Sequence, residues 1–115
     1  MLGLTDGIGN ITSYLYNNLI IDKDQQIVKG VILGDCIYNA DGNMVGKIVN
    51  DILYNTRGEI VAQKIISGQK SIAKNIADLS RQAWTIISRL KIRIAPWIEL
   101  SAKWSQATLP EILVK

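Results

Sequence analysis

The sequence predicts an α+β fold, in which an N-terminal antiparallel β module of four hairpin repeats precedes a long helix and a short helix. Three observations predict it. A sequence motif recurs every 16 or 17 residues between positions 4 and 68, and short polar pairs of residues separate its copies. From Ser71 onwards the apolar residues follow a helical period. Fixed self-similarity of this kind is typical of architectures that repeat one supersecondary unit.

The repeat is clearest in "YNADGNMVGKIVNDILYNTRGEIV", residues 38 to 61, where Tyr38-Asn39 returns as Tyr54-Asn55 sixteen positions later. Two sets of apolar residues extend the register backwards through the chain with spacings of 17, 17 and 16: Leu4, Ile21, Tyr38 and Tyr54, and Ile11, Val28, Val45 and Val61. Four copies therefore fill residues 4 to 68.

Each copy contains two kinds of turn. The short polar pairs suit two-residue hairpins, whose central residues need a positive φ; they are Asn17-Asn18, Gly34-Asp35, Asn50-Asp51 and Ser67-Gly68. The longer turns, at 22–25, 39–42 and 55–58, begin with Asp or Asn, and the last two end with Gly, as a type I turn favours. Strands are predicted between the turns, over 11–16, 19–21, 27–33, 36–38, 44–49, 52–54 and 60–66.

Four such hairpins can enclose an apolar core together, whereas one hairpin cannot bury its apolar face alone. The sequence leaves open whether they close as a small barrel or splay as petals about an axis.

The repeated pattern, Tyr-Asx-x-x-Gly-x-x-Val-Gly followed by a two-residue turn and the next Ile-Tyr, resembles the beta-flower repeat proteins over residues 4–68. That resemblance implies a hairpin-repeat fold in a group without assigned catalytic activity. The segment from Asp41 to Ile48 is also similar to the opening of the PRC-barrel, "D-x-x-G-x-x-V-G-K-V".

The C-terminal part of the chain has a different character. Residues 1–69 hold five bases against seven acids, and residues 70–115 hold eight bases against three acids, so the charge changes from −2 to +5. All three tryptophans lie in the second part. This shift in composition predicts a boundary near Ser67-Gly68, which separates a β module at 1–68 from a basic helical tail at 69–115.

An amphipathic helix is predicted from Ser71, a suitable N-cap, to the residue before Pro96. A shorter helix is predicted after it, ending before Pro110. A helix of about 24 residues would span about 36 Å, whereas a module of about 66 residues is only about 28 Å across. We therefore expect its apolar stripe to extend past the module and to meet the second helix, another subunit or a lipid surface.

The residues that could carry chemistry are few. The chain has no histidine, and its carboxylates lack partners at a recognisable catalytic spacing. Cys36 is the only cysteine, and it aligns in the repeat with Leu19 and Ile52, so it is expected inside a strand. The sequence predicts no enzyme, no cofactor and no metal site. Without a signal peptide or an apolar run of about 20 residues, the expected location is the cytoplasm.

The sequence therefore predicts a non-enzymatic structural or interaction protein that self-associates or docks into a larger assembly through its C-terminal amphipathic helix. The alternative is a peripheral membrane-surface or nucleic-acid-binding protein that uses the basic, Trp-rich tail. No small-molecule substrate is evident. The predicted interaction residues are Ile72, Ile76, Leu79, Ala83, Ile86, Leu90, Ile94, Trp97 and Trp104. The predicted anion contacts are Arg81, Arg89, Lys91, Arg93 and Lys103.

Overall fold

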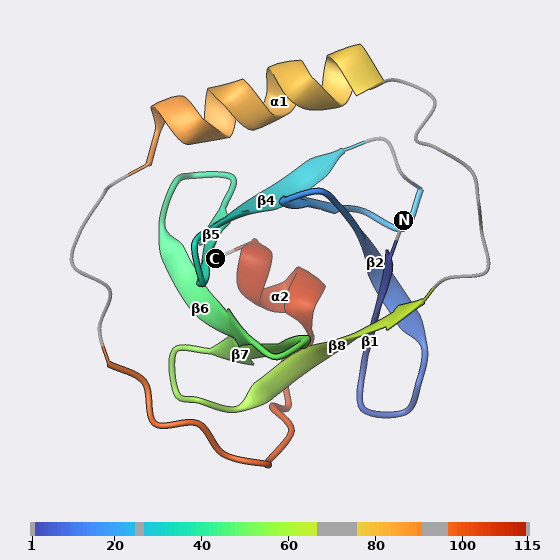
Figure 1. Cartoon of the computed structure of the whole chain (residues 1–115), viewed down its shortest axis with the longest axis vertical. Helices are drawn as coiled ribbons and strands as arrows, with labels where there is room; N and C mark the ends of the chain where they lie inside the picture. The colour runs from blue at the N-terminus through green and yellow to red at the C-terminus, as the bar shows by residue number, and fades with distance from the viewer. Residues whose placement is uncertain (1, 25–26, 67–75, 91–96, 115) are drawn as a thin grey trace.

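The computed structural model describes residues 2–24, 27–66, 76–90 and 97–114, and its framework is a closed antiparallel β-barrel (Figure 1). Each strand pairs with the next along the chain, and the last strand pairs with the first to close the ring. The strands are β1 (Leu2–Thr5), β2 (Ile11–Tyr16), β3 (Leu19–Ile21), β4 (Val28–Leu33), β5 (Cys36–Asn39), β6 (Met44–Val49), β7 (Ile52–Asn55) and β8 (Ile60–Ile66).

The longer turns share one chemistry. In three of them an Asp or Asn side-chain Oδ1 accepts hydrogen bonds of 2.9–3.0 Å from the backbone N–H groups two and four residues later; these residues are Asp6, Asn39 and Asn55. A glycine with a positive φ, between 79° and 88°, follows three residues after each of them. The repeat therefore encodes one turn geometry several times.

The barrel closes because every copy bends its strands at the same place. The strand register shifts after Leu4, Ile20, Ile37 and Leu53, which are 16 or 17 residues apart. A bulge of this kind bends and twists a sheet, and four of them distributed around eight strands supply the curvature of a barrel. The alternative of splayed petals, which the sequence left open, is thereby excluded.

A short helix, α2 (Leu109–Leu113), lies within the ring of strands (Figure 1). Its Leu109 and Leu113 are buried among inward-facing residues that include Ile20 and Ile37. Each copy of the repeat has a small buried residue that pairs with the residue before the register shift: Ser13, Gly30, Gly46 and Ala62. Gly30 contacts the end of Leu113, and an added Cβ would lie 3.0 Å from its Cδ2, so the small residue leaves room for the helix.

A longer helix, α1 (Ile76–Ser88), covers the outside of the barrel over β4 and β5. Leu79 and Ile86 pack against Val31, Cys36 and Tyr38 in a second apolar cluster. The protein thus has two cores, one inside the ring of strands and one between the ring and α1.

The described parts of the tail contact the barrel at or next to each longer turn before α2 enters the ring. The Gln82 side chain accepts a 2.8 Å hydrogen bond from the N–H of Val28, which follows the second turn. The Arg89 carbonyl lies against Gly42 in the third turn, and Ser101 donates to the Gly58 carbonyl in the fourth. The Trp104 ring then packs on Gly7 in the first turn.

The prediction of an α+β fold with a long C-terminal helix is wrong. The described helix α1 ends at Ser88, and Arg89 and Leu90 donate to carbonyls three residues earlier, which tightens the last turn. The chain then turns away to meet Gly42, so docking on the barrel overrides the helical period that the sequence continues. The predicted helical residues 71–75 and 91–95, and the predicted domain boundary near residue 68, lie outside the described residues.

The second predicted helix, which was expected to end before Pro110, is also misplaced. Around Trp104 the chain is extended and forms a parallel bridge with Ile60 at the start of β8. The helix begins instead at Leu109, with Pro110 in its first turn, where the missing N–H is tolerated. Glu111 accepts a hydrogen bond from the N–H of Thr108, in the manner of a capping box.

Candidate functional site

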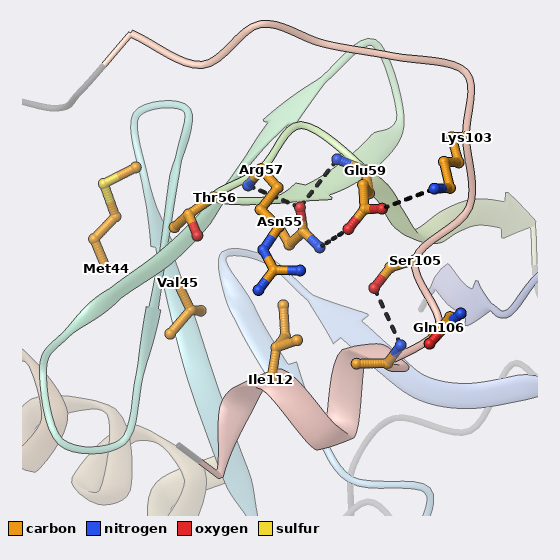
Figure 2. A pocket seen from close by; sticks show the side chains of 11 residues that line it. Met44, Val45, Asn55, Thr56, Arg57, Glu59, Lys103, Ser105, Gln106 and Ile112 are labelled. Atoms are coloured by element: carbon orange, nitrogen blue, oxygen red, sulfur yellow. Dashed lines mark hydrogen bonds and ion pairs between the residues drawn. The ribbon is translucent and has the colours of Figure 1, made fainter.

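A pocket of about 550 Å³ opens where the tail leaves the outside of the barrel and enters the ring (Figure 2). Four segments far apart in the sequence form it: the start of β6, the turn after β7, the extended segment before α2, and α2 itself. Its lining residues are Met44, Val45, Asn55, Thr56, Arg57, Glu59, Lys103, Ser105, Gln106, Ala107 and Ile112.

One wall of the pocket is a fixed polar network. Asn55 accepts backbone hydrogen bonds from Arg57 and Glu59 through Oδ1 and donates 3.1 Å to Glu59 Oε1 through its amide nitrogen. The other oxygen of Glu59 lies 3.9 Å from Lys103 Nζ. Both carboxylate oxygens of Glu59 are therefore engaged within the wall.

Arg57 differs from the other charged residues of the pocket, Glu59 and Lys103, because its side chain takes no part in the polar network of the wall. Its guanidinium extends into the pocket towards Ile112 and Val45 (Figure 2). Among the described residues no carboxylate forms an ion pair with it. Arg57 is thus the cation in this pocket whose charge the described residues leave unbalanced.

The floor of the pocket is apolar. Val45 and Ile112 are partly buried and pack against the core inside the ring of strands. The pocket therefore joins an apolar floor to a polar wall, a combination that orients small molecules in many binding sites.

A second candidate site is the outward face of α1. Trp84 lies on the exposed side of the helix and is 70% exposed. Ala77, Ser80 and Ser88 are exposed and lie within one turn of it or on the same helical row. A large aromatic side chain therefore projects beside a row of small ones, with the exposed Arg81 three residues before it.

The predicted interaction residues are distributed over several environments. Leu79, Ala83 and Ile86 are buried against the barrel, and Leu90 packs on the same cluster. Trp104 is half-buried on Gly7, whereas Trp97 is 82% exposed. Ile72 and Ile94 lie outside the described residues, as does the side chain of Ile76.

The predicted anion contacts do not gather into one surface in the described structure. Arg81 lies 3.3 Å from Asp78, and Lys103 lies near Glu59. Arg89 donates to the Ala40 carbonyl at 3.4 Å. Lys91 and Arg93 lie outside the described residues.

The sequence analysis missed the pocket and Trp84, although both had signals. In the four longer turns the position of Arg57 is held by Ile8, Asp24 and Asp41 in the other copies, so Arg57 departs from the repeat. Trp84 departs from the apolar stripe of α1 and lies on the exposed side of the helix. Residues that break a pattern without a structural need are candidates for function.

Cys36 and Tyr38 lie under α1 in the outer apolar cluster. Burial raises the pKa of the Cys36 thiol, and the adjacent Asp35 carboxylate raises it further. Burial likewise raises the pKa of Tyr38, with a smaller contribution from Cys36. The thiol is therefore held in its neutral form, as expected of a cysteine that packs in a core.

Within the described ranges, no three cysteine or carboxylate side chains come together in a group that could hold a metal ion. In the same part of the chain, no helix has the length and apolar character needed to cross a membrane. Comparison with family models, with curated proteins and with solved structures gave no match to this chain.

Proposed function

We propose that this protein is a non-enzymatic structural protein that self-associates, or docks into a larger assembly, through the outward face of α1. The observation that carries the proposal is Trp84, which is 70% exposed on that face. Exposing a tryptophan to water is unfavourable, and tryptophan is strongly enriched among the residues that dominate protein interfaces. The inward face of α1 is already covered by the barrel, so the proposed contact is on the opposite side from the apolar stripe.

The shape of this face suits a second copy of the same chain. A twofold interface requires one surface to be complementary to itself. Trp84 supplies a projection, and the small side chains of Ala77, Ser80 and Ser88 leave the backbone of the helix accessible beside it. Two α1 helices that pack together could place the indole of each on the small residues of the other.

The resemblance of the repeats to the beta-flower proteins supports the non-enzymatic part of the proposal, and we propose a relationship to that group. The closed barrel of four hairpins is compatible with it. A cytoplasmic location belongs to the same proposal, since the free, buried Cys36 is typical of a reducing compartment.

A second candidate function is binding to an anionic membrane surface or to nucleic acid. Trp97 favours the membrane form of it, because this side chain is 82% exposed and could enter a lipid interface together with the exposed Leu100, three residues later. The ion pairs of Arg81 and Lys103 count against it, because they offset part of the positive charge that would attract a polyanion. Self-association is therefore the first candidate.

Sedimentation velocity over a concentration series tests the proposal. The wild-type chain is expected to shift from monomer to dimer or a larger species as its concentration rises, and Trp84→Ser is expected to remain monomeric. Trp97→Ser is the matched control, since it removes a similarly exposed tryptophan outside α1 and should assemble like the wild type. A wild-type chain that stays monomeric at all concentrations would contradict self-association.

If the wild-type chain is monomeric, titrations with anionic vesicles and with RNA in low salt address the second candidate. A blue shift of tryptophan emission that Trp97→Ser abolishes would identify lipid binding. RNA binding with unchanged emission would identify the nucleic-acid form instead.

A further inference from the structure

We propose that the pocket beside α2 binds a small monocarboxylate, with the carboxylate on the Arg57 guanidinium and an apolar body on Val45 and Ile112. This proposal is independent of self-association, because the pocket and the outward face of α1 come from different elements. It assigns a ligand class to a cavity that the barrel fold does not itself require.

The charge of the pocket favours an anion. Glu59 is the pocket's carboxylate, and its two oxygens are engaged by Asn55 and Lys103. Arg57 remains without an ion-pair partner among the described residues, and its guanidinium extends into the cavity (Figure 2). A guanidinium presents paired N–H donors in a plane, which matches the two oxygens of a carboxylate.

The same arrangement disfavours a dianion. A phosphate would need a second free cation, and the other cation of the pocket, Lys103, already lies near Glu59. The Glu59 carboxylate would also repel a second negative charge. The single unbalanced positive charge therefore fits a ligand with one negative charge.

The apolar floor of the pocket favours a ligand whose remaining part, apart from the carboxylate, is apolar. Val45 and Ile112 offer aliphatic surface continuous with the barrel core, and Ala107 also lines the pocket. The Ser105 hydroxyl, which accepts a 3.1 Å hydrogen bond from the Ala107 N–H, can still donate its own proton to a ligand oxygen. A cavity of about 550 Å³ lies within the range of small-molecule sites.

The conformation of the turn that carries Arg57 does not depend on the arginine side chain. The equivalent turn at residues 39–43 has the same Asn, the same glycine conformation and the same backbone hydrogen bonds, with Asp41 at the position of Arg57. The fold therefore accepts an opposite charge at this position. Asp41 also provides a matched control, because a change there leaves the pocket intact.

The test is a titration of the full chain with butyrate, followed by two-dimensional amide NMR. Butanamide has the same shape without the charge, and inorganic phosphate represents a dianion. We expect butyrate to shift the amides of residues 55–59 and 103–107 in a saturable manner, while butanamide leaves them unchanged. We expect phosphate to bind more weakly than butyrate.

Two variants test whether the carboxylate of the ligand binds to Arg57. Arg57→Gln is expected to weaken butyrate binding by about 10- to 100-fold, the effect of losing charge-assisted hydrogen bonds. Asp41→Asn is expected to leave the affinity unchanged. Equal binding by Arg57→Gln, equal binding of butanamide, no response to butyrate, or tighter binding of phosphate would each overturn the proposal. The comparison of butyrate with butanamide uses the wild-type chain, so it tests the proposal even if a variant folds poorly.

Discussion

Removing the side chain of Leu109 should destabilise the whole barrel, although this residue lies only six positions before the last residue of the 115-residue sequence. Leu109 is fully buried among residues of the inner core, including Leu4, Ile20 and Leu53. Leu109→Ala removes three carbon atoms, worth about 2.4 kcal/mol at about 0.8 kcal/mol each. The strands around α2 are tied into a closed ring and cannot collapse fully, so the remaining cavity should raise the loss to about 3–5 kcal/mol.

Urea unfolding followed by circular dichroism measures this loss as the change in the free energy of unfolding. Val114→Ala is the matched control, since Val114 is 72% exposed just beyond α2 and its truncation should change stability by less than about 0.5 kcal/mol. If Leu109→Ala were as stable as the control, α2 would not fill the barrel and the reasoning would be refuted.

The remaining predictions concern the turns and the outer core. Gly58→Ala should lower the free energy of unfolding by at least about 1 kcal/mol more than Gly9→Ala. Both glycines have a positive φ, but an added Cβ at Gly58 would clash with the Glu99 carbonyl, whereas one at Gly9 would face open space. Equal losses in urea unfolding would show that the tail does not contact this turn. Asn39→Ala removes two hydrogen bonds to backbone N–H groups and should cost about 1–3 kcal/mol in thermal unfolding; a neutral change would contradict the account of the turns. The pKa of the Cys36 thiol is raised above its ordinary value of 9.0, so the folded state favours the protonated thiol. The contribution of this thiol to stability should be complete below its pKa in the unfolded chain, and it should be lost as the pH rises through its pKa in the folded protein. Unfolding free energies measured from pH 7 upwards should therefore fall more steeply above about pH 9 in the wild type than in Cys36→Ala, and parallel curves would show that the thiol does not contribute.

The strands could be predicted from the sequence because local chemistry determines them. Each turn carries its own signal, an Asx residue with a glycine or a pair that accepts a positive φ, and the strands fill the intervals between turns. The predicted runs at 11–16, 44–49 and 60–66 have the same bounds as β2, β6 and β8. Cys36 was expected in a strand because of its repeat position, and it is buried there.

The helices could not be placed because tertiary contacts decide where they end. The apolar period of α1 continues to Leu90, but the chain leaves the helix after Ser88 to dock on Gly42. The signal for α2 was present as Thr108-Leu109-Pro110-Glu111, a capping sequence with proline in the first turn, but Pro110 was interpreted as the end of a helix rather than as its beginning.

The pocket could not be predicted because it depends on segments that meet only in three dimensions. Arg57 and Ile112 are 55 positions apart, and α2 brings them together by entering the ring of strands. The exposure of Trp84 depends likewise on which face of α1 the barrel covers. A sequence pattern shows that one face is apolar, and only packing shows which residues remain at the surface.

Burial of Trp84 in the assembled state tests the proposed function most directly. In a Trp97→Phe chain, the described structure leaves Trp84 exposed and Trp104 half-buried on Gly7, so acrylamide quenching of tryptophan emission reports mainly on Trp84. The chain is diluted from about 100 μM to about 1 μM, a range that brackets the affinities of small interfaces. The proposal predicts weak quenching at high concentration and stronger quenching on dilution, as the second copy dissociates. Strong quenching that does not change with concentration would contradict it.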